Sequence, residues 1–77
     1  MVVELFTSSQ CIGCDIVKKI LKKENIKFKE IDIDTKEGYD YFNKLDVSIV
    51  PLIKIENKLI LAPITESQLK KIKEKRI

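Results

Sequence analysis

The chain has 77 residues, of which 44% are hydrophobic and 35% charged, and its formal net charge is +3. This length allows one domain with a small core and excludes a large enzyme with its own cofactor domain. The composition is typical of a folded globular chain, and no apolar run approaches the roughly 20 residues that span a bilayer. We therefore expect a single domain over residues 1–77 and no membrane partner.

The first half of the chain has the pattern of a strand, a helix and a second strand. Residues Val2 to Phe6 are apolar and begin β-branched, which favours a strand. From Ile12 to Glu24 apolar residues recur at helical spacing, and Asn25 can end that helix. Lys27 to Ile33 alternates between polar and apolar residues with one slip in phase, which favours a second strand. The unit predicts parallel strands with a right-handed crossover. The apolar face of the helix is expected to comprise Ile12, Ile16, Val17, Ile20 and Leu21.

The middle of the chain predicts a weaker helix. Asp34 or Thr35 can cap a helix over Lys36 to Leu45, although Gly38 lowers its helix propensity. The side chains expected to face the core are Tyr39, Phe42 and Leu45.

The last third predicts a hairpin followed by a helix. Leu52 to Ile55 and Leu59 to Leu61 are apolar stretches joined by a short turn, in which Asn57 can take the positive φ that a hairpin requires. Thr65 to Gln68 fits a capping box, which opens a helix with Leu69 and Ile72 toward the core. The complete order is βαβαββα, an α/β fold. The basic residues of the last helix have no aromatic residues between them, so we expect a solvated face and no nucleic-acid partner.

Two cysteines, Cys11 and Cys14, lie where the first strand turns into the first helix. Unpaired backbone N–H groups and the positive end of the helix dipole favour a thiolate at this position. Because the chain begins without the basic segment and cleavage site of a signal peptide, we expect a cytoplasmic protein among reducing buffers. In that compartment the pair indicates redox or metal chemistry rather than a structural disulfide.

Metal binding is the alternative use of the same two sulfurs. A closed zinc site needs four ligands, and the chain offers two cysteines and no histidine. An iron–sulfur cluster likewise needs about four thiolates. A copper carrier of the ferredoxin-like kind has a similar length and an early Cys-x-x-Cys, but it has a methionine where this chain has Ser9 and a βαββαβ order. A soft-metal or iron–sulfur carrier therefore remains the second hypothesis, and we expect no resident metal.

A proline precedes the third strand at Val50-Pro51, about 37 residues after Cys14. With the Cys-x-x-Cys at the first turn of a βαβ unit and a hairpin behind the proline, the sequence resembles the thioredoxin and glutaredoxin superfamily over nearly its whole length. The end of the chain is similar to that of small thioredoxin-like proteins known from archaea. The resemblance implies a four-stranded mixed sheet with helices on both faces and a cis Val50-Pro51 bond.

The same resemblance implies a small thiol–disulfide oxidoreductase that reduces protein disulfides. Cys11 would attack the disulfide and Cys14 would resolve the mixed disulfide, with no cofactor besides the redox-active pair. The residues around the cysteines and before the proline would bind the substrate: Gln10, Ile12, Gly13, Ile49, Val50 and Pro51. The expected partners are a disulfide-bearing client protein and a reductase, and the protein itself is expected to be a monomer.

The chain departs from both branches of that superfamily. Leu5 stands where thioredoxins have a buried acid in the first strand. Ser8, Leu61-Ala62 and Thr65 stand where glutaredoxins have a basic residue, Gly-Gly and Asp to hold glutathione. We therefore expect a protein reductase rather than glutathione as the electron donor. Asp15 has two possible roles. It can stabilise the first turn of the helix through the helix dipole, or it can accept the proton of Cys14, and both roles remain open.

Overall fold

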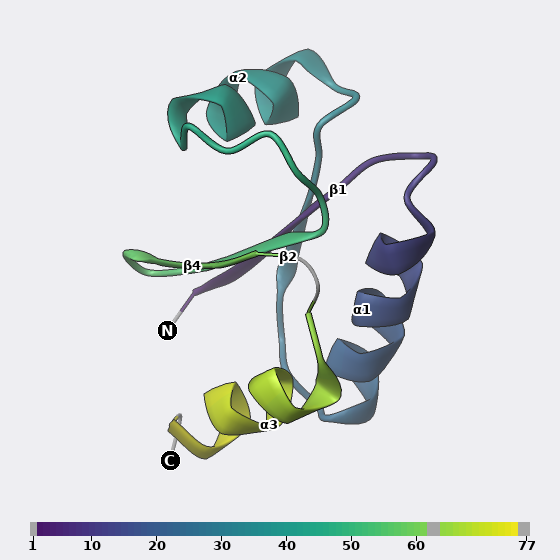
Figure 1. Ribbon diagram of the computed structural model, residues 1–77, viewed down its shortest axis with the longest axis vertical. Helices are drawn as coiled ribbons and strands as arrows, with labels where there is room; N and C mark the ends of the chain where they lie inside the picture. The colour runs from purple at the N-terminus through teal and green to yellow at the C-terminus, as the bar shows by residue number, and fades with distance from the viewer. Residues whose placement is uncertain (1, 62–63, 76–77) are drawn as a thin grey trace.

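The computed structural model describes residues 2–61 and 64–75, with the backbone alone for residues 72–75. The elements follow the predicted βαβαββα order (Figure 1). They are β1 (Val3–Thr7), α1 (Ile12–Lys23), β2 (Lys29–Asp32), α2 (Lys36–Lys44), β3 (Leu52–Ile55), β4 (Lys58–Leu61) and α3 (Glu66–Lys75). Over the described residues, no helix is both long enough and apolar enough to cross a membrane.

The strands form one mixed sheet in the order β2-β1-β3-β4. β1 pairs in parallel with β2, with Leu5 opposite Glu30, as the βαβ pattern predicts. β1 pairs antiparallel with β3, and β3 pairs antiparallel with β4. β1 and β3 therefore occupy the centre, so the segments that carry the cysteines and Pro51 emerge from neighbouring strands.

Apolar side chains fill both faces of the sheet, because successive residues of a strand point to opposite sides. On one face, α1 and α3 cover a cluster that comprises Val3, Leu5, Val17, Leu21, Ile26, Ile53 and Leu69. On the other face, α2 covers a cluster that comprises Phe6, Ile31, Phe42 and Leu52. Figure 1 shows α2 on one side of the sheet and α1 and α3 on the other. The predicted thioredoxin-like architecture with helices on both faces is confirmed.

The helix faces differ from the prediction at three positions. Ile12 and Ile16 are exposed, whereas Cys14, Val17 and Leu21 are buried. The buried stripe of α1 therefore follows residues 14, 17 and 21, and the apolar spacing alone gave the wrong face at the start of the helix. Tyr39 is also exposed, because α2 turns Gly38 and Phe42 toward the sheet instead.

β2 explains the slip in phase that its sequence contains. Phe28 packs against the α1 and α3 cluster, while Ile31 packs against the α2 cluster. Phe28 precedes β2, so the change of face falls where the chain enters the strand and not within it. The prediction of a strand from Lys27 to Ile33 was too long at both ends, because β2 spans only Lys29–Asp32.

The β3–β4 hairpin has the predicted position but a different turn residue. Glu56 takes the positive φ of 55°, so the prediction that Asn57 would do so was wrong. The favoured two-residue hairpin turns need a positive φ at their first central residue, which here is Glu56. The ammonium group of Lys54 donates a hydrogen bond of 2.7 Å to the carbonyl oxygen of Glu56 and supports this conformation.

The predicted capping box at the start of α3 is confirmed. The N–H of Thr65 donates to Oε1 of Gln68 at 2.9 Å, and the N–H of Gln68 donates to the hydroxyl of Thr65 at 3.3 Å. Leu69 is buried as expected. The prediction for Ile72 concerns a side chain outside the described residues.

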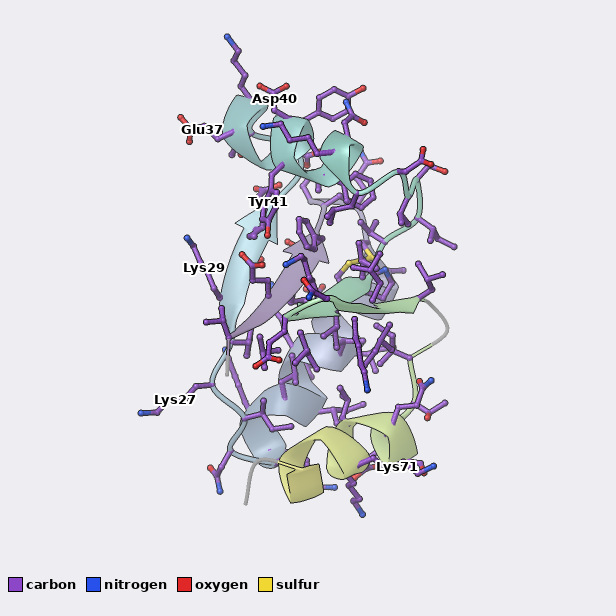
Figure 2. The ribbon with its side chains drawn as sticks, turned by 90° about the vertical axis from the view of Figure 1, so that its left-hand side faces the viewer. Lys27, Lys29, Glu37, Asp40, Tyr41 and Lys71 are labelled. Carbon is purple, nitrogen blue, oxygen red and sulfur yellow. A yellow bond between two sulfur atoms is a disulfide. The ribbon has the colours of Figure 1, made fainter. Side chains whose placement is uncertain are left out.

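Tyr41 joins α2 to the sheet through a side-chain hydrogen bond. Figure 2 shows it pointing from α2 toward the strands, where its hydroxyl donates to Oε1 of Glu4 at 2.6 Å. Its ring lies 5.3 Å from that of Phe6. The hydrogen bond to Glu4, with burial and the charge of that carboxylate, raises the pKa of Tyr41 to about 12. The hydroxyl therefore remains a donor over the whole neutral range.

Gly38 holds the first turn of α2 against the end of β2. Thr35 is the N-cap, and its hydroxyl accepts a bond of 3.1 Å from the N–H of Gly38 and donates one of 2.7 Å to the carbonyl of Asp32. A Cβ at position 38 would overlap that carbonyl oxygen and lie 2.8 Å from its carbon. The glycine that weakened the helix prediction is therefore the residue that lets the helix pack here.

We expect Gly38→Ala to destabilise the protein. Alanine gains about 1 kcal/mol of helix propensity, but overpacking against a fixed backbone carbonyl costs roughly 1–3 kcal/mol. The net loss should lower the melting temperature by several degrees in a calorimetric scan. Asn43→Ala, at an exposed position of the same helix, should leave it nearly unchanged. Equal melting temperatures for the two variants would contradict the close contact.

Candidate active site

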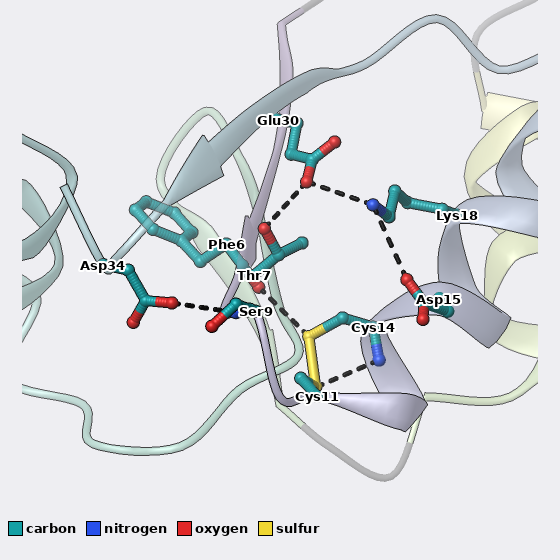
Figure 3. The surroundings of a disulfide bond; sticks show 9 residues. All are labelled: Phe6, Thr7, Ser9, Cys11, Cys14, Asp15, Lys18, Glu30 and Asp34. Atoms are coloured by element: carbon teal, nitrogen blue, oxygen red, sulfur yellow. Dashed lines mark hydrogen bonds and ion pairs between the residues drawn. A yellow bond between two sulfur atoms is a disulfide. The ribbon is translucent and has the colours of Figure 1, made fainter.

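The two cysteines form a disulfide across the first turn of α1. Cys11 is the N-cap, with extended backbone angles, and Cys14 lies in the first helical turn. Their Cα atoms are 5.2 Å apart, and the N–H of Cys14 donates to Sγ of Cys11 at 3.0 Å (Figure 3). The Cys11 sulfur thus occupies the place that a capping oxygen usually takes. A thiolate there is stabilised by a backbone donor and by the helix dipole.

The two sulfurs differ in access to solvent. Cys14 is 1% exposed, whereas Cys11 is only half-buried. The sulfur of Cys14 lies 3.8 Å from the carbonyl oxygen of Phe6 in β1. When the disulfide is reduced, the Cys14 thiol can donate to that oxygen and so keep its orientation toward Cys11. A large disulfide partner can therefore reach Cys11 first.

Pro51 lies beside the cysteine loop, immediately before the central strand β3. The Val50–Pro51 peptide bond is cis. A Cβ built on Gly13 would lie 3.4 Å from Cδ of Pro51, so the backbone between the cysteines passes directly over the proline ring. The structure thereby brings together two of the residues that the sequence proposed for substrate binding.

The other proposed binding residues surround this contact to different extents. Gln10 and Ile12 are exposed, Ile49 is 47% exposed, and Val50 is half-buried against the α2 cluster. Ile12, which follows Cys11 in the chain, is 78% exposed and leaves an apolar side chain in solvent. Such residues are free to contact a protein partner.

A polar network near the disulfide was not predicted from the sequence. The hydroxyl of buried Thr7 donates to Oε2 of Glu30 at 2.9 Å, and the ammonium group of Lys18 donates to the same oxygen at 3.1 Å (Figure 3). Asp15 extends the network, 3.7 Å from that ammonium group. Burial disfavours the charged form of Glu30, but hydrogen bonds from Lys18 and Thr7 outweigh it and hold the pKa of Glu30 below 4.5. Thr7 and Glu30 are 23 positions apart, and only the parallel pairing of β1 with β2 brings them together.

Among the described residues, no three histidine, cysteine, aspartate or glutamate side chains lie close enough together to hold a metal ion.

Comparisons with known proteins place this site in a family. The family model described as glutaredoxin matches residues 3–60. The chain belongs to the glutaredoxin family. This glutaredoxin-family protein is a redoxin, and membership implies thiol–disulfide oxidoreductase activity in general, with disulfide clients and reductases as the usual partners. No curated protein matches the chain.

Solved structures share the fold of this glutaredoxin-family protein. The glutaredoxin-like NrdH-redoxin of Escherichia coli superposes with a TM-score of 0.78 at 14% identity, covering 94% of this chain and 95% of that one. The glutaredoxin of Archaeoglobus fulgidus gives a TM-score of 0.75 at 26% identity over 90% and 82% of the two chains. Thioredoxin 1 of Thermosipho africanus gives 0.74 at 22% identity over 99% and 93%.

The lowered pKa of Glu30 predicts how stability depends on pH. The pKa of Glu30 is lower in the folded protein than its ordinary value of 4.5 in an unfolded chain. The ionised carboxylate therefore stabilises the fold at pH values above 4.5, and this contribution is lost as the pH falls through the folded-state pKa. Lys18→Met removes the main partner, so its loss of stability should be larger at pH 7 than at pH 3. Urea unfolding at the two pH values measures the difference. Lys19→Met, on the same helix, should show no such dependence; an equal pH dependence in both variants would contradict the network.

Proposed function

We propose that this redoxin reduces disulfide bonds of client proteins in the cytoplasm through its Cys11–Cys14 couple. The observation that carries the proposal is the asymmetry of the pair: a half-buried sulfur at a helix N-terminus is linked to a sulfur that is 1% exposed. The first position favours a reactive thiolate and the second restricts its thiol to attack from within. The couple itself carries the two electrons, so the proposal includes no further cofactor.

The reaction follows from this placement in two exchanges. The Cys11 thiolate attacks one sulfur of the client disulfide, and the other client sulfur leaves as a thiolate that takes a proton from solvent. Cys14 then loses its proton and attacks the Cys11 sulfur of the mixed disulfide, and the second client thiolate leaves and is protonated. Because the two cysteines lie in one helical turn with their Cα atoms 5.2 Å apart, the second step is effectively unimolecular.

The docking surface that we propose lies around the Gly13 and Pro51 contact. Gly13 has no side chain, so the backbone between the cysteines packs closely against Pro51, and the two loops together offer backbone groups to an extended client segment. The exposed Ile12 and Ile49 would contact apolar client side chains, and Gln10 and the backbone of Val50 offer hydrogen bonds. A single chain carries all of these groups, and we propose that the protein acts as a monomer.

We propose a protein reductase rather than glutathione as the electron donor. Ser8 carries no charge to attract the carboxylates of glutathione. The N–H and the hydroxyl of Thr65 are both engaged by Gln68 in the cap of α3. The E. coli neighbour is described as a glutaredoxin-like protein with a thioredoxin-like activity profile. A glutaredoxin-like fold is therefore compatible with thioredoxin-like activity, as we propose for this protein.

The cysteine roles predict distinct behaviour for two variants. Cys11→Ser should lower the rate of insulin-disulfide reduction with dithiothreitol to the uncatalysed rate, because no accessible nucleophile remains. Cys14→Ser should instead capture one client per chain as a mixed disulfide, visible by non-reducing electrophoresis. Asn43→Ala should behave as the unchanged protein. Turnover by Cys11→Ser, or capture by neither variant, would contradict the assignment.

The electron donor and the metal alternative need separate measurements. Turnover of the oxidised protein with a thioredoxin reductase should exceed that with glutathione at matched concentrations; the reverse order would refute the proposed donor. Copper or zinc retained in stoichiometric amounts by the purified protein, without client reduction, would favour the carrier hypothesis.

A further inference from the structure

The loop that carries Cys11 is tied to a distant part of the chain. Oδ2 of Asp34, in the turn between β2 and α2, accepts a hydrogen bond of 2.9 Å from the N–H of Ser9 (Figure 3). Ser9 lies two residues before Cys11, and the two partners are 25 positions apart in the chain. The bond joins the loop that follows β1 to the turn that follows the neighbouring parallel strand β2.

The acceptor end of this bond is held firmly. The N–H of Asp34 donates to Oδ1 of Asp32 at 2.9 Å, and the N–H of Thr35 donates to the carbonyl oxygen of Asp32 at 3.2 Å. Thr35 in turn caps α2, which packs closely on the same carbonyl through Gly38. These hydrogen bonds fix the backbone of the turn that carries Asp34. The Asp34 carboxylate can therefore hold the N–H of Ser9 in one position.

The donor end has few other restraints. Ser9 and Gln10 are exposed. Among the described residues, the Cys11 N–H donates to the carbonyl of Ser8 at 3.3 Å, and the Cys11 sulfur accepts from the N–H of Cys14 at 3.0 Å. The first bond closes a β-turn inside the loop and the second ties Cys11 to α1, so neither fixes the turn to the sheet. Hydrogen bonding by Ser9, through its side chain and its backbone, holds the pKa of Asp34 below 3.8, so the acceptor is ionised at neutral pH.

We propose that Asp34 is a positioning residue for Cys11: it holds the loop so that the Cys11 sulfur stays next to Cys14 when the disulfide is open. This inference rests on the proposed function of the pair as a dithiol–disulfide couple. In the oxidised state the covalent bond fixes Cys11. In the reduced state an untied loop would gain conformational freedom, and closing the disulfide would then cost that freedom again.

The test measures the equilibrium between the dithiol and the disulfide. The full chain is incubated in glutathione redox buffers, quenched with acid and alkylated, and the two forms are counted by mass spectrometry. Asp34→Ala should lower the equilibrium constant for closing the disulfide about three- to tenfold, a cost no larger than that of ordering roughly one residue of backbone. Asp34→Asn keeps an acceptor oxygen without the charge and should stay within about twofold of the unchanged protein.

A second background separates the hydrogen bond from other effects of the substitution. Ser9 is the second residue of the β-turn, where proline is favoured, so Ser9→Pro removes the donor N–H and still fits the turn. In the Ser9→Pro background, Asp34→Ala should have no further effect. Asp40→Ala, which removes an exposed carboxylate from α2, serves as the charge control and should have no effect in either background.

The outcomes distinguish this inference from the proposed function. An unchanged equilibrium in Asp34→Ala, or an equal loss in both backgrounds, overturns the positioning role, whereas client reduction by the unchanged protein would still support the redox function. If the unchanged protein fails to reduce clients but Asp34→Ala still weakens disulfide closure, the proposed function is wrong and the positioning of Cys11 stands.

Discussion

The contact on which the site depends is that between the Cys11 sulfur and the free backbone N–H groups at the start of α1. An N-cap normally offers an oxygen, and a sulfur in its place couples the helix start to the charge state of one thiol. Other elements surround this contact: β1 supplies the carbonyl beside Cys14, the loop before β3 places Pro51 against Gly13, and the β2–α2 turn supplies the carboxylate that accepts from Ser9.

The geometry also explains how a domain of this size can hold a redox-active pair in a fixed position. Its core is divided into two clusters on either side of one sheet, and the cysteine loop leaves the end of the central strand β1. Both loops that form the site therefore start from the most buried strands. This is the part of a small domain with the least freedom to move.

Sequence reasoning predicted the features that depend on local patterns, and it failed where tertiary packing decided the outcome. The capping box at Thr65 and the helix start at Cys11 follow from short-range chemistry, and both are confirmed. The exposure of Ile12 depends on which side of α1 meets the sheet, a choice that apolar spacing does not specify. The bond from Ser9 to Asp34 joins residues 25 positions apart, so only the assembled fold brings them together.

The strand order makes the two outer borders of the sheet chemically unequal. Three of the four residues of β2 are charged: Lys29, Glu30 and Asp32. A strand of another molecule that paired with β2 would have to desolvate these charges, which is unfavourable. In β4, Leu59 and Leu61 are partly exposed. A strand of another molecule that paired with β4 would bury part of this apolar surface, which is favourable. Accidental self-association through backbone pairing is thus opposed more strongly along β2 than along β4, where Lys58 is the one charged residue of the strand.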